Sequence, residues 1–221
     1  MQALDLAQFL SRISFYGIPV LCAITLHEVA HGWTARYFGD RTAELLGRLS
    51  LNPLRHIDPI GTLIVPALLL CFHGPLIGWA KPVPVATGSL RNPQRAMLLV
   101  ALAGPAANLV MAALWCALLA ALVHLNGEVM LVSWMASMAQ AGIVVNVILA
   151  AFNLLPIPPL DGGRIVTALL PARWSGGLAR LEPIGLVLVL GLSALGLLRW
   201  LFDPTLRVVG LVINAVFASR A

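Results

Sequence analysis

The stretch HEVAH, residues 27–31, places three ionisable side chains inside an apolar segment, residues 13–38. Charged side chains cost at least about 2.5 to 3.5 kcal/mol each at the centre of a bilayer, so buried ones usually have a partner and a function. Histidines four residues apart share one helical face, the spacing at which two imidazoles bind one Zn²⁺. The pattern predicts His27 and His31 as metal ligands, with Glu28 beside them as a general base. The alternative is a pair of histidines that hydrogen-bond packed helices together, which would leave the Glu28 charge unpaired.

The composition is that of a membrane protein. Of 221 residues, 60% are hydrophobic and 10% are charged, whereas soluble domains have about 25% charged residues. Stretches between apolar segments are short, so residues 1–221 are expected to form a single integral-membrane domain. The formal charge of +5 comes mainly from arginines in short loops, which orient membrane helices, so no nucleic-acid partner is expected. The three cysteines lack ligand spacing and are expected to be small core residues.

Four helix starts are predicted where an acidic or amide residue precedes proline: Asp58-Pro59, Asn92-Pro93, Glu182-Pro183 and Asp203-Pro204. Hydropathy then predicts a short helix at 163–170 and longer ones at residues 13–38, 59–72, 93–125, 129–153, 183–202 and 204–219. The segments 59–72 and 204–219 are marginal for a crossing. The expected fold class is therefore an all-α polytopic membrane protein with about five to six membrane helices, a re-entrant segment, and short extended pieces at residues 47–51 and 79–85.

A second polar element interrupts the apolar pattern at NLLPIPPLDGG, residues 153–163. Irregular backbone at membrane depth is tolerated where it lines a cavity. Asp161 in this stretch would be a third protein ligand and would leave the fourth Zn²⁺ position open, as catalytic zinc sites require. Taken alone, an Asp before two glycines is also an ordinary helix cap.

The distribution of basic residues predicts the topology. Four arginines lie at or after the C-terminal end of the first helix, so this end should face the cytoplasm: Arg36, Arg41, Arg48 and Arg55. Lys81, Arg91 and Arg95 favour the same side, which requires residues 59–80 to dip into the bilayer and return. The helix from residue 93 then runs outward, and the helix from residue 129 returns and brings Asp161 to the side of the two histidines.

Together, these motifs resemble the site-2 protease family of intramembrane zinc metalloproteases, and the match covers most of the chain. The family signatures His-Glu-x-x-His and Asn-x-x-Pro-x-Pro-x-x-Asp-Gly correspond to residues 27–31 and 153–162. A Gly-Pro-x-x-Asn element at 104–108 is also similar, and residues 78–85 resemble an extended segment of compact bacterial members. The resemblance implies a catalytic core of three helices at residues 13–38, 93–125 and 129–162. The PDZ insertion and nucleotide-binding regulatory domain of some relatives are not expected.

The resemblance also implies an activity: a zinc-dependent metalloendopeptidase, a hydrolase, with one Zn²⁺ per chain. Its substrates would be membrane proteins cut in or near a transmembrane helix, in regulated intramembrane proteolysis or in clearance of remnants left by a site-1 protease. The expected location is the bacterial cytoplasmic (inner) membrane, with the active site toward the cytoplasm. The oligomeric state stays open. A small ion or metal transporter built on the same buried cluster is the rival interpretation, against which Glu28 and the absence of internal repeats weigh.

Further residues have two interpretations each. The family resemblance makes Asn153 catalytic, donating to the developing oxyanion or holding the substrate backbone, whereas an interhelical hydrogen bond is the alternative. Asn108 either contacts substrate or supports close helix packing, and its spacing favours packing. The extended stretch could pair with an unwound substrate by strand addition, or serve as an inert connector; the residues concerned are Trp79, Val83 and Val85.

Overall fold

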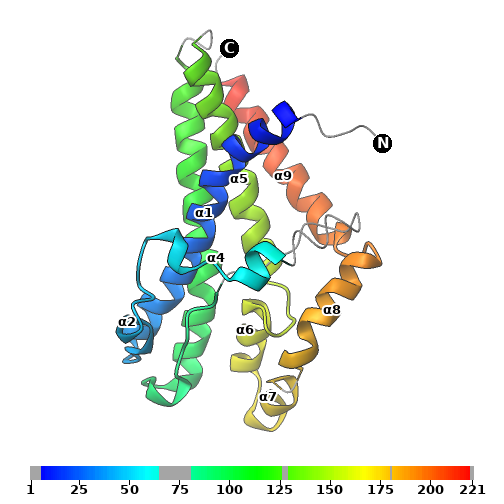
Figure 1. The fold of residues 1–221 in the computed structure, drawn as a ribbon. Coiled ribbons are helices and arrows are strands. Elements are labelled where there is room, and N and C mark those ends of the chain that lie inside the picture. Colours follow the sequence, from blue (N-terminus) through cyan, green and yellow to red (C-terminus); the bar gives the residue numbers. More distant parts are fainter. Residues whose placement is uncertain (1–5, 65–80, 126–128, 180, 220–221) are drawn as a thin grey trace.

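The computed structural model describes residues 6–64, 81–125, 129–179 and 181–219, and these residues are predominantly helical, without a β-strand (Figure 1). The long helices are α1 (Leu6–Tyr37), α4 (Pro93–Val123), α5 (Met130–Asn153) and α9 (Arg199–Ala218). The shorter ones are α2 (Thr42–Leu45), α6 (Asp161–Leu169), α7 (Ala172–Ala179) and α8 (Glu182–Ala194). The described residues also contain three short helical segments: η1 (Pro53–Arg55), η2 (Pro59–Ile64) and η3 (Thr87–Ser89). The predicted all-α class is confirmed.

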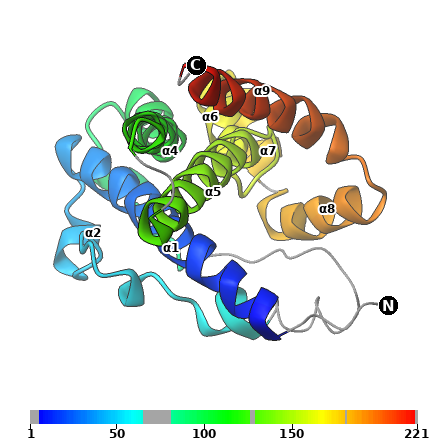
Figure 2. The ribbon, with the colours of Figure 1, turned by 90° about the horizontal axis from the view of Figure 1, so that it is seen from above.

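A bundle of α1, α4 and α5 forms the centre of the fold, and each of these helices packs against the other two. Figure 2 shows α8 and α9 to one side of this bundle, with α2 and the loop after it on the other side. Small residues allow the close approach: Ala35 of α1 and Ala96 of α4 are fully buried in one cluster. On α5, a Cβ at Gly142 would collide with the Trp115 ring of α4. The three helices predicted as the catalytic core therefore do pack together.

Three described helices, α4, α5 and α9, are long and apolar enough to cross a membrane. Large apolar side chains are exposed on them, including Leu114 of α4 and Leu211 of α9. Such a surface is stable against lipid and unfavourable in water. The chain is therefore an integral membrane protein. The number of membrane helices, about five to six by sequence, stays a prediction beyond these three, because part of the segment 59–72 lies outside the described residues.

Two predicted helix boundaries near the C-terminal end are wrong. The helix expected at 183–202 ends at Ala194, and the helix expected to begin at Pro204 begins at Arg199, so that Pro204 lies inside it. Gly196 explains the break, because it adopts a left-handed φ of 71°. The N–H of Leu197 donates to the Leu192 carbonyl across this turn, which is the Schellman arrangement that ends many helices.

The other predicted helix starts agree better with the structure. Asp58 accepts hydrogen bonds from the N–H groups of Ile60 and Gly61, so it caps the turn that begins at Pro59. Helix α4 begins at Pro93 as predicted, although the Asn92 side chain makes no capping bond. The short helix expected at 163–170 begins two residues earlier, at Asp161. Helix α7 was not predicted from the sequence.

Candidate metal centre

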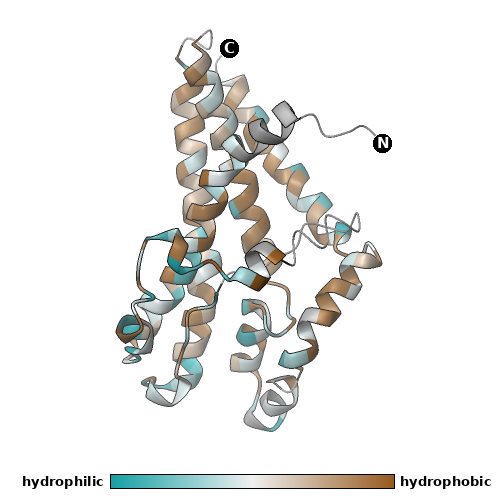
Figure 3. Ribbon diagram, in the orientation of Figure 1, coloured by the Kyte–Doolittle hydropathy of each residue, from teal (hydrophilic) through white to brown (hydrophobic). Residues whose placement is uncertain are grey.

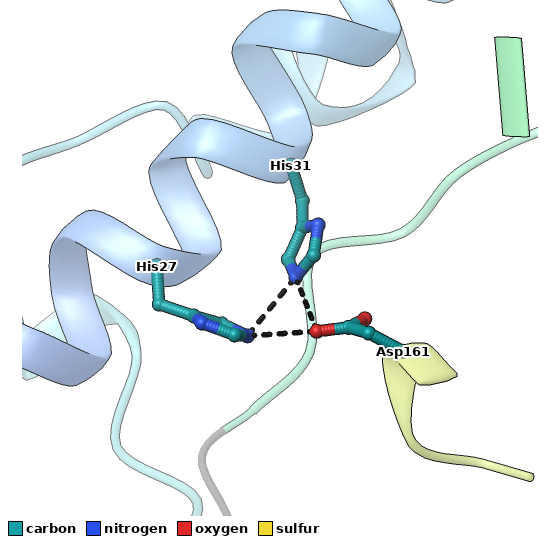
Figure 4. Close-up of side chains that lie close together, drawn as sticks. All are labelled: His27, His31 and Asp161. Atoms are coloured by element: carbon teal, nitrogen blue, oxygen red, sulfur yellow. Dashed lines mark hydrogen bonds and ion pairs between the residues drawn. The ribbon is translucent and has the colours of Figure 1, made fainter. Parts of the chain in front are cut away.

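Two histidines of α1 and the first residue of α6 meet in the interior of the bundle (Figure 4). His27 Nε2 and His31 Nε2 lie 3.0 Å apart, and Asp161 Oδ2 lies 3.2 Å and 3.3 Å from them. All three side chains are buried. The cap position of α6 is occupied by Leu160, and Asp161 does not cap the helix. The structure therefore brings together the three residues that the sequence predicted as ligands.

The hydrogen bonds around the two imidazoles define which nitrogens face the centre. His27 Nδ1 lies 2.6 Å from Asn108 Oδ1, and His31 Nδ1 lies 2.6 Å from the Val100 carbonyl oxygen. Both partners are acceptors, so each Nδ1 carries the proton in the neutral ring and each Nε2 presents a lone pair. Asp161 Oδ2 is buried and accepts no hydrogen bond within the described part of the chain.

Three electron-pair donors thus converge in a buried space, an arrangement that repels itself unless a cation lies between them. Two imidazole nitrogens and one carboxylate oxygen form the donor set of a catalytic zinc site with an open fourth position. These atoms all lie within 4.8 Å of one another, close enough to hold one ion. The donor set therefore fits Zn²⁺.

Two buried side-chain amides, Asn108 and Asn146, are linked by a hydrogen bond and support the His27 ring at its Nδ1. Asn108 on α4 donates through Nδ2 to the Ala23 carbonyl, at 3.2 Å, and to Asn146 Oδ1, at 3.0 Å. Asn146 on α5 donates in turn to the Gly142 carbonyl. Asn108 has no exposed surface and its amide is engaged on both sides. These contacts support the packing interpretation of Asn108 over a substrate contact, and they give it the orienting role that partners of metal-bound histidines usually have.

We expect Asn146→Ala to weaken zinc binding about 10-fold or more, because Asn108 would lose the partner that fixes its amide and, through it, the His27 tautomer. The measurement is competition for zinc with a chromophoric chelator. Ser137→Ala is the matched control, since it removes one side-chain hydrogen bond to the backbone of the same helix. Equal zinc affinity in Asn146→Ala and in the control would contradict the orienting role.

Position 104 of α4 must be glycine, because the imidazoles of His27 and His31 lie directly against the α4 backbone there. A Cβ on this residue would lie within 2.6 Å of atoms of both His27 and His31. We expect Gly104→Ala to displace the rings and to reduce both zinc content and proteolysis, with overpacking of about 1–3 kcal/mol. Gly17→Ala on α1 is the control, because nothing lies within 4 Å of the added Cβ. A Gly104→Ala protein with wild-type zinc content would contradict this account.

Glu28 follows the first ligand and contacts an irregular segment, residues 81–86. Its Oε2 accepts a hydrogen bond of 2.8 Å from the Val83 N–H. The N–H of Lys81 donates to the His56 carbonyl, and the N–H of Ala86 donates to Asp40 Oδ2. Hydrogen bonds therefore fix both ends of this segment, and an N–H in its middle binds the Glu28 carboxylate.

Asp40 is an anchor that no motif in the sequence indicated. It is buried just after the end of α1 and also accepts hydrogen bonds from the N–H and hydroxyl of Thr42. Burial acts to raise the pKa of Asp40, but the hydrogen bonds from Thr42 and Ala86 outweigh it and hold this pKa below its usual value. The carboxylate that anchors Ala86 is thus charged at neutral pH.

The substrate-binding prediction for the extended stretch needs revision at Val83. Its N–H, expected to pair with substrate, instead holds Glu28, and its side chain is buried. Val85 is partly buried against the cluster around Ala35. Trp79 lies outside the described residues. Beside this stretch lies a groove of about 680 Å³, bounded by residues 82–85, the start of α4, Pro158, Pro159 and the face of α6 that carries Arg164.

Asn153 is the last residue of α5 and is partly buried. One N–H of its side-chain amide donates to the Leu149 carbonyl, at 3.0 Å, within the same helix. Its catalytic role stays a prediction. Apart from Asp40, the contacts that the sequence did not indicate are made by main-chain groups, the Val100 carbonyl and the Val83 N–H, which leave no trace in the side-chain pattern.

The chain is similar in sequence to bacterial zinc metalloproteases. A Bacillus subtilis protein named "Putative zinc metalloprotease YwhC" is 38% identical over 201 residues, which cover 90% of this chain and 88% of that protein. Proteins of Mycolicibacterium smegmatis and Mycobacterium tuberculosis, both named "Putative zinc metalloprotease Rip2", are 34% identical over 89% and 83% of this chain and 76% and 71% of their own lengths. With the buried donor set, these likenesses define the class: a zinc metalloprotease, and hence a hydrolase.

The family follows from the same likenesses and from a family-level match. The model of peptidase family M50 matches residues 119–192, which include Asp161 and the end of α5. The chain belongs to this family, the site-2 proteases. No solved structure was found to match it significantly.

Proposed function

We propose that the protein cleaves peptide bonds in or near transmembrane helices of other membrane proteins. The observation that carries this proposal is the position of His27, His31 and Asp161, which are buried in a bundle that includes α4 and α5, two helices long and apolar enough to cross a membrane. We expect a membrane helix that partly unwinds, and not a folded soluble protein, to reach such a centre. Residues 1–221 would act as one integral-membrane domain.

The residues of the centre have distinct proposed roles. His27, His31 and Asp161 hold Zn²⁺, which when bound supplies Lewis-acid activation of water and of the scissile carbonyl. Glu28 takes the proton of the attacking water and delivers it to the leaving amide nitrogen. Asn153 donates to the oxyanion or to the substrate backbone. The Val83 N–H keeps the Glu28 carboxylate in place.

The groove beside residues 82–85 is where we propose that the unwound substrate lies. Its walls are mostly apolar, and Arg164 at its edge lies 3.8 Å from Glu182. Pro82 and Pro84 lack N–H groups and the Val83 N–H is bound to Glu28, so within residues 82–84 only the carbonyl groups are left to pair with substrate. A carbonyl left unbonded is open to attack.

The proposed topology places the centre toward the cytoplasmic side of the bacterial inner membrane, because three arginines follow α1 and Lys81 and Arg91 precede α4. We expect single cysteines at Arg55 and Arg91, in a background without Cys22, Cys71 and Cys116, to label from the cytoplasm. A cysteine at Leu125, beyond the end of α4, should label from outside. The measurement is labelling with an impermeant maleimide. Labelling of positions 55 and 91 from opposite sides would refute the re-entrant segment.

The test of the function is a quantitative comparison of membrane proteomes from cells with wild-type protein and with Glu28→Gln. Membrane proteins, or remnants left by an earlier site-1 cut, should accumulate in the variant strain if the protein performs regulated intramembrane proteolysis or clearance. An unchanged membrane proteome, combined with altered cellular metal content, would instead favour the transporter interpretation.

A further inference from the structure

A loop after α1 exposes both leucines and arginines, and we call residues 41–56 the arginine–leucine loop. Four leucines are largely exposed in it, with exposed fractions of 83%, 62%, 66% and 71% for Leu45, Leu46, Leu51 and Leu54. Figure 3 shows hydrophilic and hydrophobic residues interleaved along this loop, unlike the mostly hydrophobic long helices. Leucines exposed in this number are unfavourable in water and indicate a surface that something apolar covers.

Two arginines lie among these leucines, and their guanidinium groups retain N–H donors that can bind another group. Arg48 donates to the Arg55 carbonyl, and Arg55 donates to the Gly47 carbonyl, at 3.1 Å. The ion pairs of the described residues include Arg36 and Arg41 with Glu44, but neither Arg48 nor Arg55. A guanidinium has five N–H donors, so both arginines retain donors beyond these backbone bonds.

We propose that the arginine–leucine loop lies in the membrane interface and binds the phosphate groups of anionic phospholipids through Arg48 and Arg55. The leucines would enter the boundary between headgroups and acyl chains, as the apolar side chains of interfacial segments do. Guanidinium groups bind phosphate by paired hydrogen bonds. Charge complementarity therefore selects anionic over zwitterionic lipid, and the neighbouring apolar bundle places the loop beside a bilayer.

The loop is connected to the catalytic groups by two contacts. Leu49 packs against Gly32, the residue that follows His31, so closely that a Cβ on Gly32 would collide with it. At the end of the loop, the His56 carbonyl accepts the N–H of Lys81, where the segment that holds Glu28 begins. Bound lipid would thereby fix the depth of the catalytic centre relative to the cytoplasmic surface.

The proposal can be tested without measuring proteolysis, so its failure is distinguishable from failure of the proposed function. Leu51→Cys, in a background without Cys22, Cys71 and Cys116, is labelled with an environment-sensitive fluorophore. The protein is reconstituted in phosphatidylcholine vesicles that contain equal small fractions of either spin-labelled phosphatidylglycerol or spin-labelled phosphatidylcholine. We expect quenching by phosphatidylglycerol to be at least about threefold more effective, given the attraction of each arginine to an anionic lipid.

Arg48→Gln with Arg55→Gln should abolish this preference and leave quenching by phosphatidylcholine in place, because the leucines remain. The control replaces two exposed arginines elsewhere, Arg95 and Arg173, with Gln and thus removes the same net charge. It should keep the preference. Equal quenching by the two lipids in the wild type, absence of quenching by either, or equal loss of the preference in the control would each overturn the proposal.

Discussion

Glu28→Gln is expected to reduce the rate of peptide-bond hydrolysis by at least about 10²-fold while zinc content and fold stay unchanged. The amide oxygen of Gln can still accept the hydrogen bond that the Val83 N–H gives to Glu28 Oε2, so the side chain should stay in place. What the variant loses is the ability to take a proton from water. The measurement is turnover of a reconstituted membrane-protein substrate, with zinc content determined on the same sample.

Glu44→Gln is the control for this experiment. Glu44 is partly exposed and pairs with Arg36 and Arg41 at the protein surface, where ion pairs contribute little. The Glu44→Gln protein should hydrolyse substrate at the wild-type rate. Hydrolysis by Glu28→Gln within a few-fold of this control would show that another group is the base.

Asp161→Ala is expected to reduce zinc from about one ion per chain to a small fraction of that at matched free zinc. With Asp161 removed, two imidazoles of one helix remain, and two protein ligands hold Zn²⁺ much less tightly than three. Proteolysis should fall with the metal. The measurement is metal analysis after dialysis against a zinc buffer, together with a helicity spectrum to confirm the fold.

Asp203→Ala, which removes an exposed carboxylate from α9, should keep its zinc. His27→Ala and His31→Ala should behave like Asp161→Ala, because the three donors surround one point. If Asp161→Ala kept the zinc content of the control, Asp161 would not be a ligand, and its carboxylate would have to be stabilised in the interior in another way.

The sequence predicted the centre better than it predicted the helix ends near the C-terminus. The ligand set could be predicted because ionisable side chains in an apolar segment are rare, and because the i, i+4 spacing of His27 and His31 fixes their relative position on a helix. The contribution of Asp161 required only that its segment return to the same side of the membrane. In the structure, the Asp161 carboxylate does lie beside both imidazoles.

Contacts made by the main chain could not be predicted in this way. The Val83 N–H that holds Glu28 and the Val100 carbonyl that orients His31 belong to groups present in almost every residue. Their partners are decided by tertiary packing. At the C-terminal end, Asp203-Pro204 indicated a helix start, but the left-handed Gly196 already ends α8, and α9 resumes at Arg199. A glycine after an apolar helix was the stronger local indication.

The three donors of the metal centre come from two distant parts of the chain, so the centre cannot form early in biosynthesis. His27 and His31 belong to the first helix, whereas Asp161 follows α5, more than half the chain later. A nascent chain released after α1 and α4 would carry both imidazoles and Glu28 but no complete centre. The centre of the newly made protein therefore stays incomplete until α6 has emerged and docked, and only then can it hold a metal ion through all three donors.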